Sequence, residues 1–187
     1  NLFNWIWENT VNYSNNFGMY HKVNLIAGYT AQKERIERSV IESNGFTDDQ
    51  ITTINGGIVN SGEEVIEEWS LVSALARLNY VFQDKYLLTA TVRSDRSSRF
   101  GANNQTGIFP SFSLGWRANQ ESFLSGVDEI SELKFRASYG VTGNFEIPNY
   151  GAIGLLGGAN YVDGSSQING VAPSTSSNAD LTWETTC

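Results

Sequence analysis

Residues 72–95 read VSALARLNYVFQDKYLLTATVRSD, and the fold follows from their alternation. Every even-numbered residue from 72 to 82 is apolar or aromatic, whereas Ser73, Arg77 and Asn79 lie between them. The alternation returns over 86–95, after a polar pair at 83–84. A period of two is typical of a half-buried β-strand, and a short polar turn between two such runs is typical of a hairpin. The stretch therefore predicts two antiparallel strands joined by a tight turn.

The same pattern continues on both sides of this hairpin. It predicts further strands over 3–13, 23–30, 111–117 and 133–141, and a last strand that begins at Leu181. The chain contains 18 Gly, 5 Trp, 8 Tyr and 10 Phe, a composition that favours strands and the turns between them. We therefore expect an all-β antiparallel meander of about seven strands. Because the chain opens within one aromatic run and closes soon after another begins, we expect it to be a section of a longer protein.

The connections alternate between short and long. Tight turns are predicted at 14–18 and 83–84, and long polar loops at 32–68, 96–108 and 143–180. The connection through 121–124 is of moderate length, and residues 46–51 suggest a short helix capped by Thr47 or Asp48. Outer-membrane barrels have short turns on one side and long external loops on the other, so the alternation favours a membrane barrel.

The two predicted faces of the sheet differ in chemistry. The apolar face carries aromatic residues in two groups, one of Tyr13, Tyr80, Phe82, Tyr86 and Trp116 and one of Trp5, Trp7, Tyr29 and Tyr139, with Leu25, Ala27, Ala76, Leu88 and Ala90 between them. Two aromatic girdles around an aliphatic band are typical of a face in contact with lipid. The opposite face carries six charged residues, Arg77, Arg93, Asp95, Arg117, Lys134 and Arg136.

Ionised groups are costly in lipid, so we expect these six residues to face the lumen of a wide barrel. The five cations among them would contact substrate or an internal plug, or pair with acids of the wall such as Asp95 and Glu8. The alternative fold is a soluble or surface β-sandwich, whose core face would also be apolar and whose outer face would be polar. Such a module would bind glycans through Tyr and Trp side chains.

Five stretches have a distinctive sequence: ARLNY at 76–80, DKYLLTATVRSD at 84–95, SSRFG at 97–101, FPSFSLGWR at 109–117 and LKFRASYGVTGN at 133–144. Together they resemble one family, the SusC/RagA-type TonB-dependent receptors. The resemblance is specific over about 69–150 and rests elsewhere on the rhythm of strands and loops. The family usually has Gly where this chain has Arg96, which puts the turn geometry at that position in question.

The resemblance implies a 22-stranded outer-membrane barrel, of which residues 1–187 would be a partial TonB-dependent receptor β-barrel. The plug domain, the TonB-contacting segment and the remaining strands would lie outside this chain. The whole protein would sit in outer-membrane lipid, work with a SusD-like surface lipoprotein and with TonB, and import an oligosaccharide or peptide substrate. Within this chain, the external loops would contribute substrate contacts, for which Trp69 and Tyr161 are the candidates.

Other chemistries lack support in the sequence. The net charge of −8 repels phosphate backbones and argues against nucleic-acid binding. His21 is the only histidine and Cys187 the only cysteine, and no nucleotide, zinc or nucleophile motif is present. We therefore expect no catalytic, cofactor or metal site, and no enzyme. The acidic residues at 63–64 and 67–68 would either bind a cation such as calcium or form a solvated loop rim.

Overall fold

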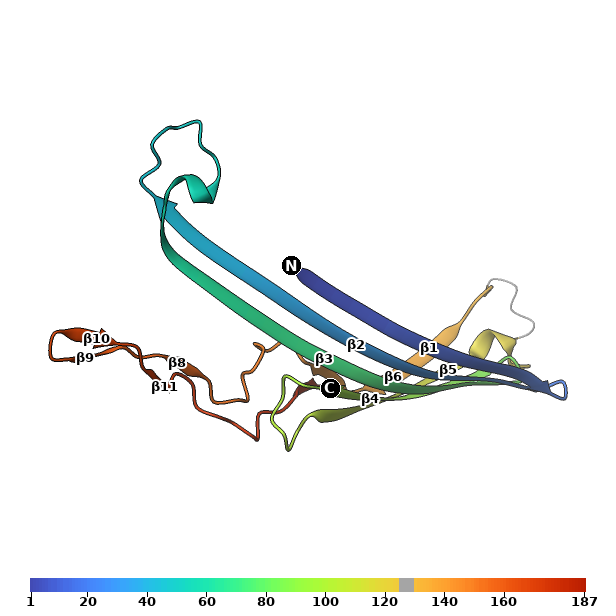
Figure 1. Cartoon of the computed structure of the whole chain (residues 1–187). Coiled ribbons are helices and arrows are strands. Elements are labelled where there is room, and N and C mark those ends of the chain that lie inside the picture. The colour runs from blue at the N-terminus through green and yellow to red at the C-terminus, as the bar shows by residue number, and fades with distance from the viewer. Residues whose placement is uncertain (125–129) are drawn as a thin grey trace.

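The computed structural model describes residues 1–124 and 130–187. Its main element is one antiparallel sheet with the strand order β1-β2-β3-β4-β5-β6, so that neighbours along the chain are neighbours in space (Figure 1). The strands are β1 (Leu2–Phe17), β2 (His21–Asn44), β3 (Ile58–Phe82), β4 (Tyr86–Ser97), β5 (Thr106–Arg117) and β6 (Lys134–Gly140). The predicted meander is confirmed, and the sheet is open because β1 and β6 form its two edges.

Short strands make up the C-terminal part of the chain. They are β7 (Thr142–Asn144), β8 (Leu156–Gly158), β9 (Tyr161–Asp163), β10 (Ser166–Ile168), β11 (Val171–Pro173) and β12 (Glu184–Thr186). The pairs β8–β11 and β9–β10 turn part of the predicted loop 143–180 into a narrow hairpin arm (Figure 1). The strand predicted from Leu181 begins instead at Glu184 and pairs with β7, which continues the direction of β6 beyond Gly140.

The predicted loop over 32–68 is wrong for most of its length. Strands β2 and β3 remain paired as far as Asn44 and Ile58, with one register shift at Glu42/Ser43, and only residues 45–57 connect them. The sequence shows no alternation there, because polar residues occupy both faces of the two strands. The strands still pair, because the backbone hydrogen bonds between them need no apolar side chains. The short helix expected over 46–51 is also wrong. A 3₁₀ turn, η1 (Ile54–Gly56), lies a few residues later, and the amide of Gln50 bonds the carboxylate of Asp48 in a local turn.

Two tight turns define one end of the sheet, which we call the short-turn end. The predicted turn at 83–84 is confirmed, because Gln83 and Asp84 both have positive φ, 53° and 54°, as the central residues of a type I′ β-turn do, and the amide of Lys85 donates to the carbonyl of Phe82 at 3.0 Å. The turn predicted over 14–18 is shifted, since β1 extends to Phe17 and the reversal occurs over 18–20. Gly18 takes the left-handed conformation there, with φ of 65°.

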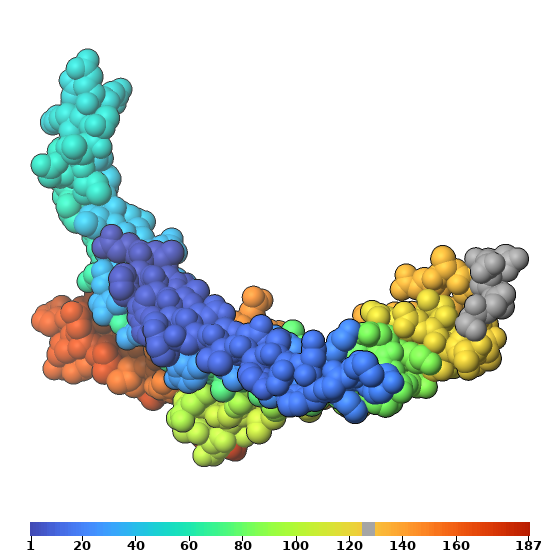
Figure 2. Space-filling view, turned by 90° about the vertical axis from the view of Figure 1, so that its right-hand side faces the viewer, coloured from blue at the N-terminus to red at the C-terminus, as the bar shows by residue number. Residues whose placement is uncertain are grey.

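The opposite end, which we call the long-loop end, carries the connections 45–57 and 98–105 and the hairpin arm (Figure 1). The tip of the β2–β3 hairpin stands well clear of the rest of the molecule (Figure 2). The predicted segregation of short and long connections is confirmed only in part, because the β5–β6 connection at the short-turn end, 118–133, is longer than 45–57 and 98–105. A second 3₁₀ turn, η2 (Ala118–Gln120), begins the β5–β6 connection at the short-turn end, part of which lies outside the described residues. Within those residues, no helix is long and apolar enough to span a bilayer.

The register assigns the two faces. Residues paired across antiparallel strands lie on the same face, so one row runs through Tyr13, Leu25, Leu78, Ala90, Phe112 and Tyr139. We call this side the apolar face. The adjacent row runs through Asn12, Ile26, Arg77, Thr91, Ser111 and Gly140, and we call that side the polar face. The faces predicted from alternation are confirmed for these strands, with Ile26 as an apolar member of the polar face.

Candidate functional site

All six predicted charged residues lie on the polar face. Arg77 is opposite Thr91, which fixes the side of the alternate β4 residues Arg93 and Asp95. Arg136 is opposite Gly115, and Lys134 is opposite Arg117. The six residues therefore share one surface across four neighbouring strands, with five cations and one acid.

Their contacts divide them into paired and unpaired groups. The Nε of Arg93 donates to both carboxylate oxygens of Asp95, at 2.8 and 2.7 Å, and its Nη2 donates to the Ser73 hydroxyl at 3.2 Å. The Nη1 of Arg117 donates to the carbonyl of Asp84 at 3.1 Å. Among the residues that the structure describes, Arg77, Lys134 and Arg136 have no acidic partner.

The expected wall pairing is therefore found for Arg93 and Asp95. It is not found for Glu8, which lies opposite Thr30 at the β1–β2 ladder. Since β3 separates β2 from β4, Glu8 is too far along the sheet to neutralise the cations of β4 to β6. The positions of these residues in the sequence did not predict how far apart Glu8 and the cations lie across the sheet.

A cavity of about 480 Å³ opens on the polar face over β3 to β7. Its polar lining includes Arg77, Thr91, Arg93, Asp95 and Ser111. Its apolar lining includes Leu71, Leu75, Phe109, Val141 and Phe145. Val141 was expected on the apolar face, but it packs with Phe109 on the opposite side, because the main ladder ends at Gly140.

One wall of this cavity belongs to the main buried cluster. Phe100, Phe109 and Trp183 form that cluster, with Leu71, Val141, Phe145, Ile147 and Leu181 packed against it. The ring centroids of Phe100 and Trp183 are 4.5 Å apart. A Cβ on Gly143 would overlap the Phe109 ring, and a Cβ on Gly101 would overlap the carbonyl of Ala179. The close contacts of these two backbone positions with their neighbours therefore depend on glycine. The cluster joins the motif at 97–101 to a segment about 80 residues later, which sequence analysis did not detect.

The apolar face begins at the short-turn end with a row of rings. Paired positions on the six strands are Phe17, His21, Phe82, Tyr86, Trp116 and Phe135. The His21 ring lies 5.0 Å from that of Phe82, and Trp116 lies 5.7 Å from Phe135. His21 is thus a member of this aromatic row, and its Nδ1 lies 2.6 Å from the Tyr80 hydroxyl.

Two of the predicted girdle positions change. Tyr13 and Tyr139 were expected near opposite ends, but the register places both in one row, away from the aromatic row. Alternation identifies the face of a residue and carries no information on its height in the sheet. Trp5, Trp7 and Tyr29 do lie toward the long-loop end, and the rings of Trp7 and Tyr29 meet edge to face at 5.7 Å.

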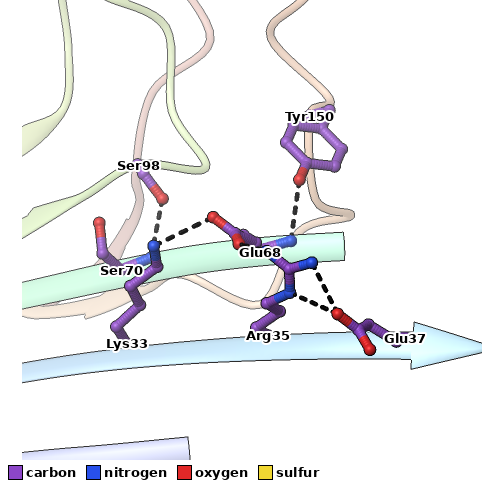
Figure 3. Close-up of polar contacts among 7 residues, drawn as sticks. All are labelled: Lys33, Arg35, Glu37, Glu68, Ser70, Ser98 and Tyr150. Carbon is purple, nitrogen blue, oxygen red and sulfur yellow. Dashed lines mark hydrogen bonds and ion pairs between the residues drawn. The ribbon is translucent and has the colours of Figure 1, made fainter. Parts of the chain in front are cut away.

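From Tyr29 toward the long-loop end, the same face changes from apolar to charged. Figure 3 shows the polar contacts of this charged part. Lys33 Nζ lies 3.0 Å from one oxygen of Glu68, and Arg35 Nη1 donates to the other oxygen at 2.9 Å. Arg35 Nη2 also lies 2.6 Å from Glu37. The amide of Glu68 donates to the Tyr150 hydroxyl at 2.8 Å, which ties this charged cluster to the segment that follows β7. Of the acidic residues at 63–68, Glu68 is therefore paired with cations of the neighbouring strand.

Glu121 organises the short-turn end outside the strands. Its carboxylate accepts bonds from Tyr86 at 2.7 Å, Lys85 at 2.9 Å and the Trp116 indole at 3.2 Å. Hydrogen bonds from Tyr86, Lys85 and Trp116, in that order of effect, lower the pKa of Glu121 to about 2. The β5–β6 connection is thus fastened to the turn between β3 and β4.

The two expected substrate contacts fall in different environments. Trp69 lies within β3 and is 8% exposed, because Arg99 covers its ring and its indole donates to Glu34 at 2.9 Å. Its expected place in an external loop is wrong. Tyr161 is 56% exposed on the hairpin arm. Within residues 1–124 and 130–187, no three His, Cys, Asp or Glu side chains are grouped to hold a metal ion.

A family model described as "TonB dependent receptor-like, beta-barrel" matches residues 1–186. The chain belongs to the TonB-dependent receptor β-barrel family. Proteins of this family lie in the outer membrane, and the predicted resemblance is confirmed.

Named relatives of this TonB-dependent receptor chain agree with the assignment. TonB-dependent receptor P3 of Formosa agariphila is 35% identical over 99% of the chain, which corresponds to 19% of the relative. TonB-dependent receptor P39 of the same organism is 37% identical over 96% of the chain and 17% of the relative. TonB-dependent receptor SusC of Bacteroides thetaiotaomicron is 47% identical over 42% of the chain and 8% of the relative.

Solved structures share the fold of this receptor chain. The structure titled "Structure of the RagAB peptide transporter" superimposes with a TM-score of 0.89 at 28% identity, over 98% of the chain and 20% of the other. A RagAB peptide importer in the "open-open" state gives a TM-score of 0.84 at 29% identity, over 96% of the chain and 20% of the other. The chain thus spans about a fifth of the length of these proteins.

Proposed function

We propose that this chain forms part of the barrel wall of a TonB-dependent importer of nutrients in the outer membrane. In this proposal residues 1–187 are a partial barrel, and the plug and the remaining strands lie outside them. Membership of the receptor family supports the assignment, and the chemistry of the two faces supports the wall.

The height of the apolar face is the observation that carries the proposal. On β3 this face runs from Phe82 in the aromatic row to Val72, and the charged residue Glu68 follows soon after. Ten residue steps at about 3.4 Å each give about 34 Å along the strand. A tilt of about 40° reduces this to about 26 Å, close to the height of about 25 Å of the apolar band of outer-membrane barrels. The sheet therefore has the dimensions of a membrane wall.

The polar face would line the lumen. Arg77 lies level with the middle of the apolar band, where an ionised side chain facing lipid would be costly. In an open water-filled barrel the same residue is solvated. We therefore assign Arg77, Arg93, Asp95, Arg117, Lys134 and Arg136 to the lumen side.

The substrate and partners follow from the family resemblance. A structural neighbour is titled a peptide transporter, which favours peptide as the substrate class, with oligosaccharide as the alternative. A SusD-like surface lipoprotein would cover the external side, and TonB would supply energy through parts outside this chain. The exposed Tyr161 remains the proposed external substrate contact. Transport, with no catalytic step in this chain, is the activity we assign.

The sandwich hypothesis requires a second sheet over the apolar face. Among the described residues that face stays open, with Tyr13 50%, Leu25 44% and Phe112 45% exposed. Because a soluble sandwich buries such residues between two sheets, the single layer supports the membrane wall instead.

Deletion of the gene for the whole receptor in its own organism tests the proposal. Growth would be measured on a peptide mixture and on oligosaccharides as alternative sole nutrients. We expect growth on one class to fall and to return on complementation, and the receptor to sediment with outer membranes. Unchanged growth on both classes, or recovery of the receptor in detergent-free buffer, would count against the proposal.

A further inference from the structure

The cavity on the polar face differs from the rest of that face in its combination of charge and apolar surface. Arg77 and Arg93 enter it from neighbouring strands, and Asp95 supplies its acidic group. Asp95 is only 7% exposed and is bound by Arg93 through both oxygens. The ion pair neutralises Arg93, so the remaining positive charge of the cavity belongs to Arg77.

The Arg77 guanidinium has hydrogen-bond donors that no described residue occupies. Its Nε donates to the Thr91 hydroxyl at 3.2 Å, and this bond orients the guanidinium within the ladder. Neither terminal nitrogen has a bonding partner among the described residues, and the side chain is exposed. A guanidinium presents its donors as a planar fork that matches the two oxygens of a carboxylate.

On the side toward the long-loop end, the residues beside the Arg77 guanidinium are apolar. Phe109 is 8% exposed and held by the buried cluster, while Val141 and Phe145 pack beside it. A wall of this kind gains free energy when it buries a hydrocarbon group. The site therefore matches a ligand that carries an anionic group next to an apolar one.

We propose that this cavity binds a carboxylate flanked by an apolar group, with Arg77 as the two-pronged donor and Phe109, Val141 and Phe145 as the apolar contact. The proposal rests on the assignment of the polar face to the barrel lumen. Two sources supply this chemistry inside a receptor: an acidic peptide on its way through the barrel, or an acidic side chain from another part of the same receptor.

Binding to the purified full-length receptor in detergent tests the proposal. The probes are a labelled hexapeptide that alternates leucine and glutamate and its leucine–glutamine counterpart, both blocked at their ends. The variants are Arg77→Gln and, as the matched control, Arg136→Gln. Arg136 lies on the same face, is exposed and has no acidic partner, but it does not line the cavity.

With peptide as the source, the wild-type receptor binds the glutamate probe at least tenfold more tightly than the glutamine probe. Arg77→Gln removes this preference and Arg136→Gln retains it. With the receptor itself as the source, neither probe is preferred, and Arg77→Gln alone accelerates amide hydrogen exchange in the part of the receptor that faces the cavity. Equal effects of the two variants, or no effect of Arg77→Gln on either measurement, would overturn the proposal.

The binding assay needs no transport, so it separates this inference from the proposed function. If the receptor fails to restore growth but still prefers the glutamate probe, the proposed importer function is wrong and the proposed carboxylate site stands. A receptor that restores growth but is indifferent to Arg77→Gln in both measurements would contradict the site alone.

Discussion

The guanidinium carbon of Arg99 lies 4.7 Å from the centre of the Trp69 ring. It also lies 5.7 Å from the Phe145 ring, and its Nε donates to Asn149 at 2.8 Å. One side chain from the β4–β5 connection therefore joins strand β3 to the segment that follows β7. Trp69 is a structural residue in this arrangement, and Arg99 is the link that holds the segment against the sheet.

Replacement of Arg99 by alanine should loosen that segment. A partly buried cation–π contact contributes about 1–2 kcal/mol, so we expect faster amide exchange over residues 145–150 in the full-length receptor. Arg96→Ala is the control, because the exposed Arg96 side chain bonds Gln105 and no other side chain of the described residues. Equal exchange in the two variants would show that Arg99 does not hold the segment.

The carboxylate of Glu121 predicts a pH dependence at the short-turn end. Its pKa is lowered to about 2 in the folded state, below the ordinary 4.5. A depressed folded pKa means that the stabilisation is complete above about pH 4.5 and is lost as the pH falls toward 2. Urea unfolding of the receptor in micelles between pH 6 and pH 2.5 should therefore show a loss of stability that Glu121→Gln reduces.

The control for this measurement is Glu132→Gln, an exposed acid of the same connection without a side-chain partner in the described part of the chain. This variant should keep the wild-type profile. Identical profiles for Glu121→Gln and the wild type would exclude the carboxylate as the source of the acid sensitivity.

Neighbouring residues on β4 distinguish the two faces. Ala90 lies in the apolar row between Leu78 and Phe112, whereas Thr91 lies on the polar face opposite Arg77. Ala90→Arg should destabilise the receptor in lipid by about 2–4 kcal/mol, the cost of a cation near the middle of a lipid-facing strand. Thr91→Arg should cost much less, because its side chain would reach water. Unfolding in vesicles that costs both variants the same free energy would contradict the lipid and lumen assignment.

The open sheet predicts that residues 1–187, expressed alone, aggregate in water. The unpaired edges of β1 and β6 and the exposed apolar face both promote association. Expressed alone, the chain should precipitate in buffer and become dispersed only with detergent, as judged by size-exclusion chromatography. A monodisperse monomer that melts cooperatively without detergent would argue for a soluble module.

Local sequence was sufficient for the central parts of the six long strands and for the faces of their residues. The alternation around Leu78 and Ala90 predicted both correctly, because successive side chains in a strand point to opposite sides whatever the partner strand is. Charge on alternate positions likewise placed Arg77, Arg93 and Asp95 on one surface. The family resemblance rested on contiguous motifs, most of them within the same strands, and the match of the family model confirmed it.

The tertiary structure decided what depends on pairing across the sheet. The extension of β2 and β3 to Asn44 and Ile58 depends on backbone hydrogen bonds, which leave no mark on a polar sequence. Likewise, Trp183 meets Phe100 only when the end of the chain returns to the β4–β5 connection. The register that unites the aromatic row, and the lack of an ion-pair partner for Arg77 among the described residues, are set by contacts between residues far apart in the chain. Sequence alternation specifies the side of each residue, and only the folded sheet specifies its neighbours.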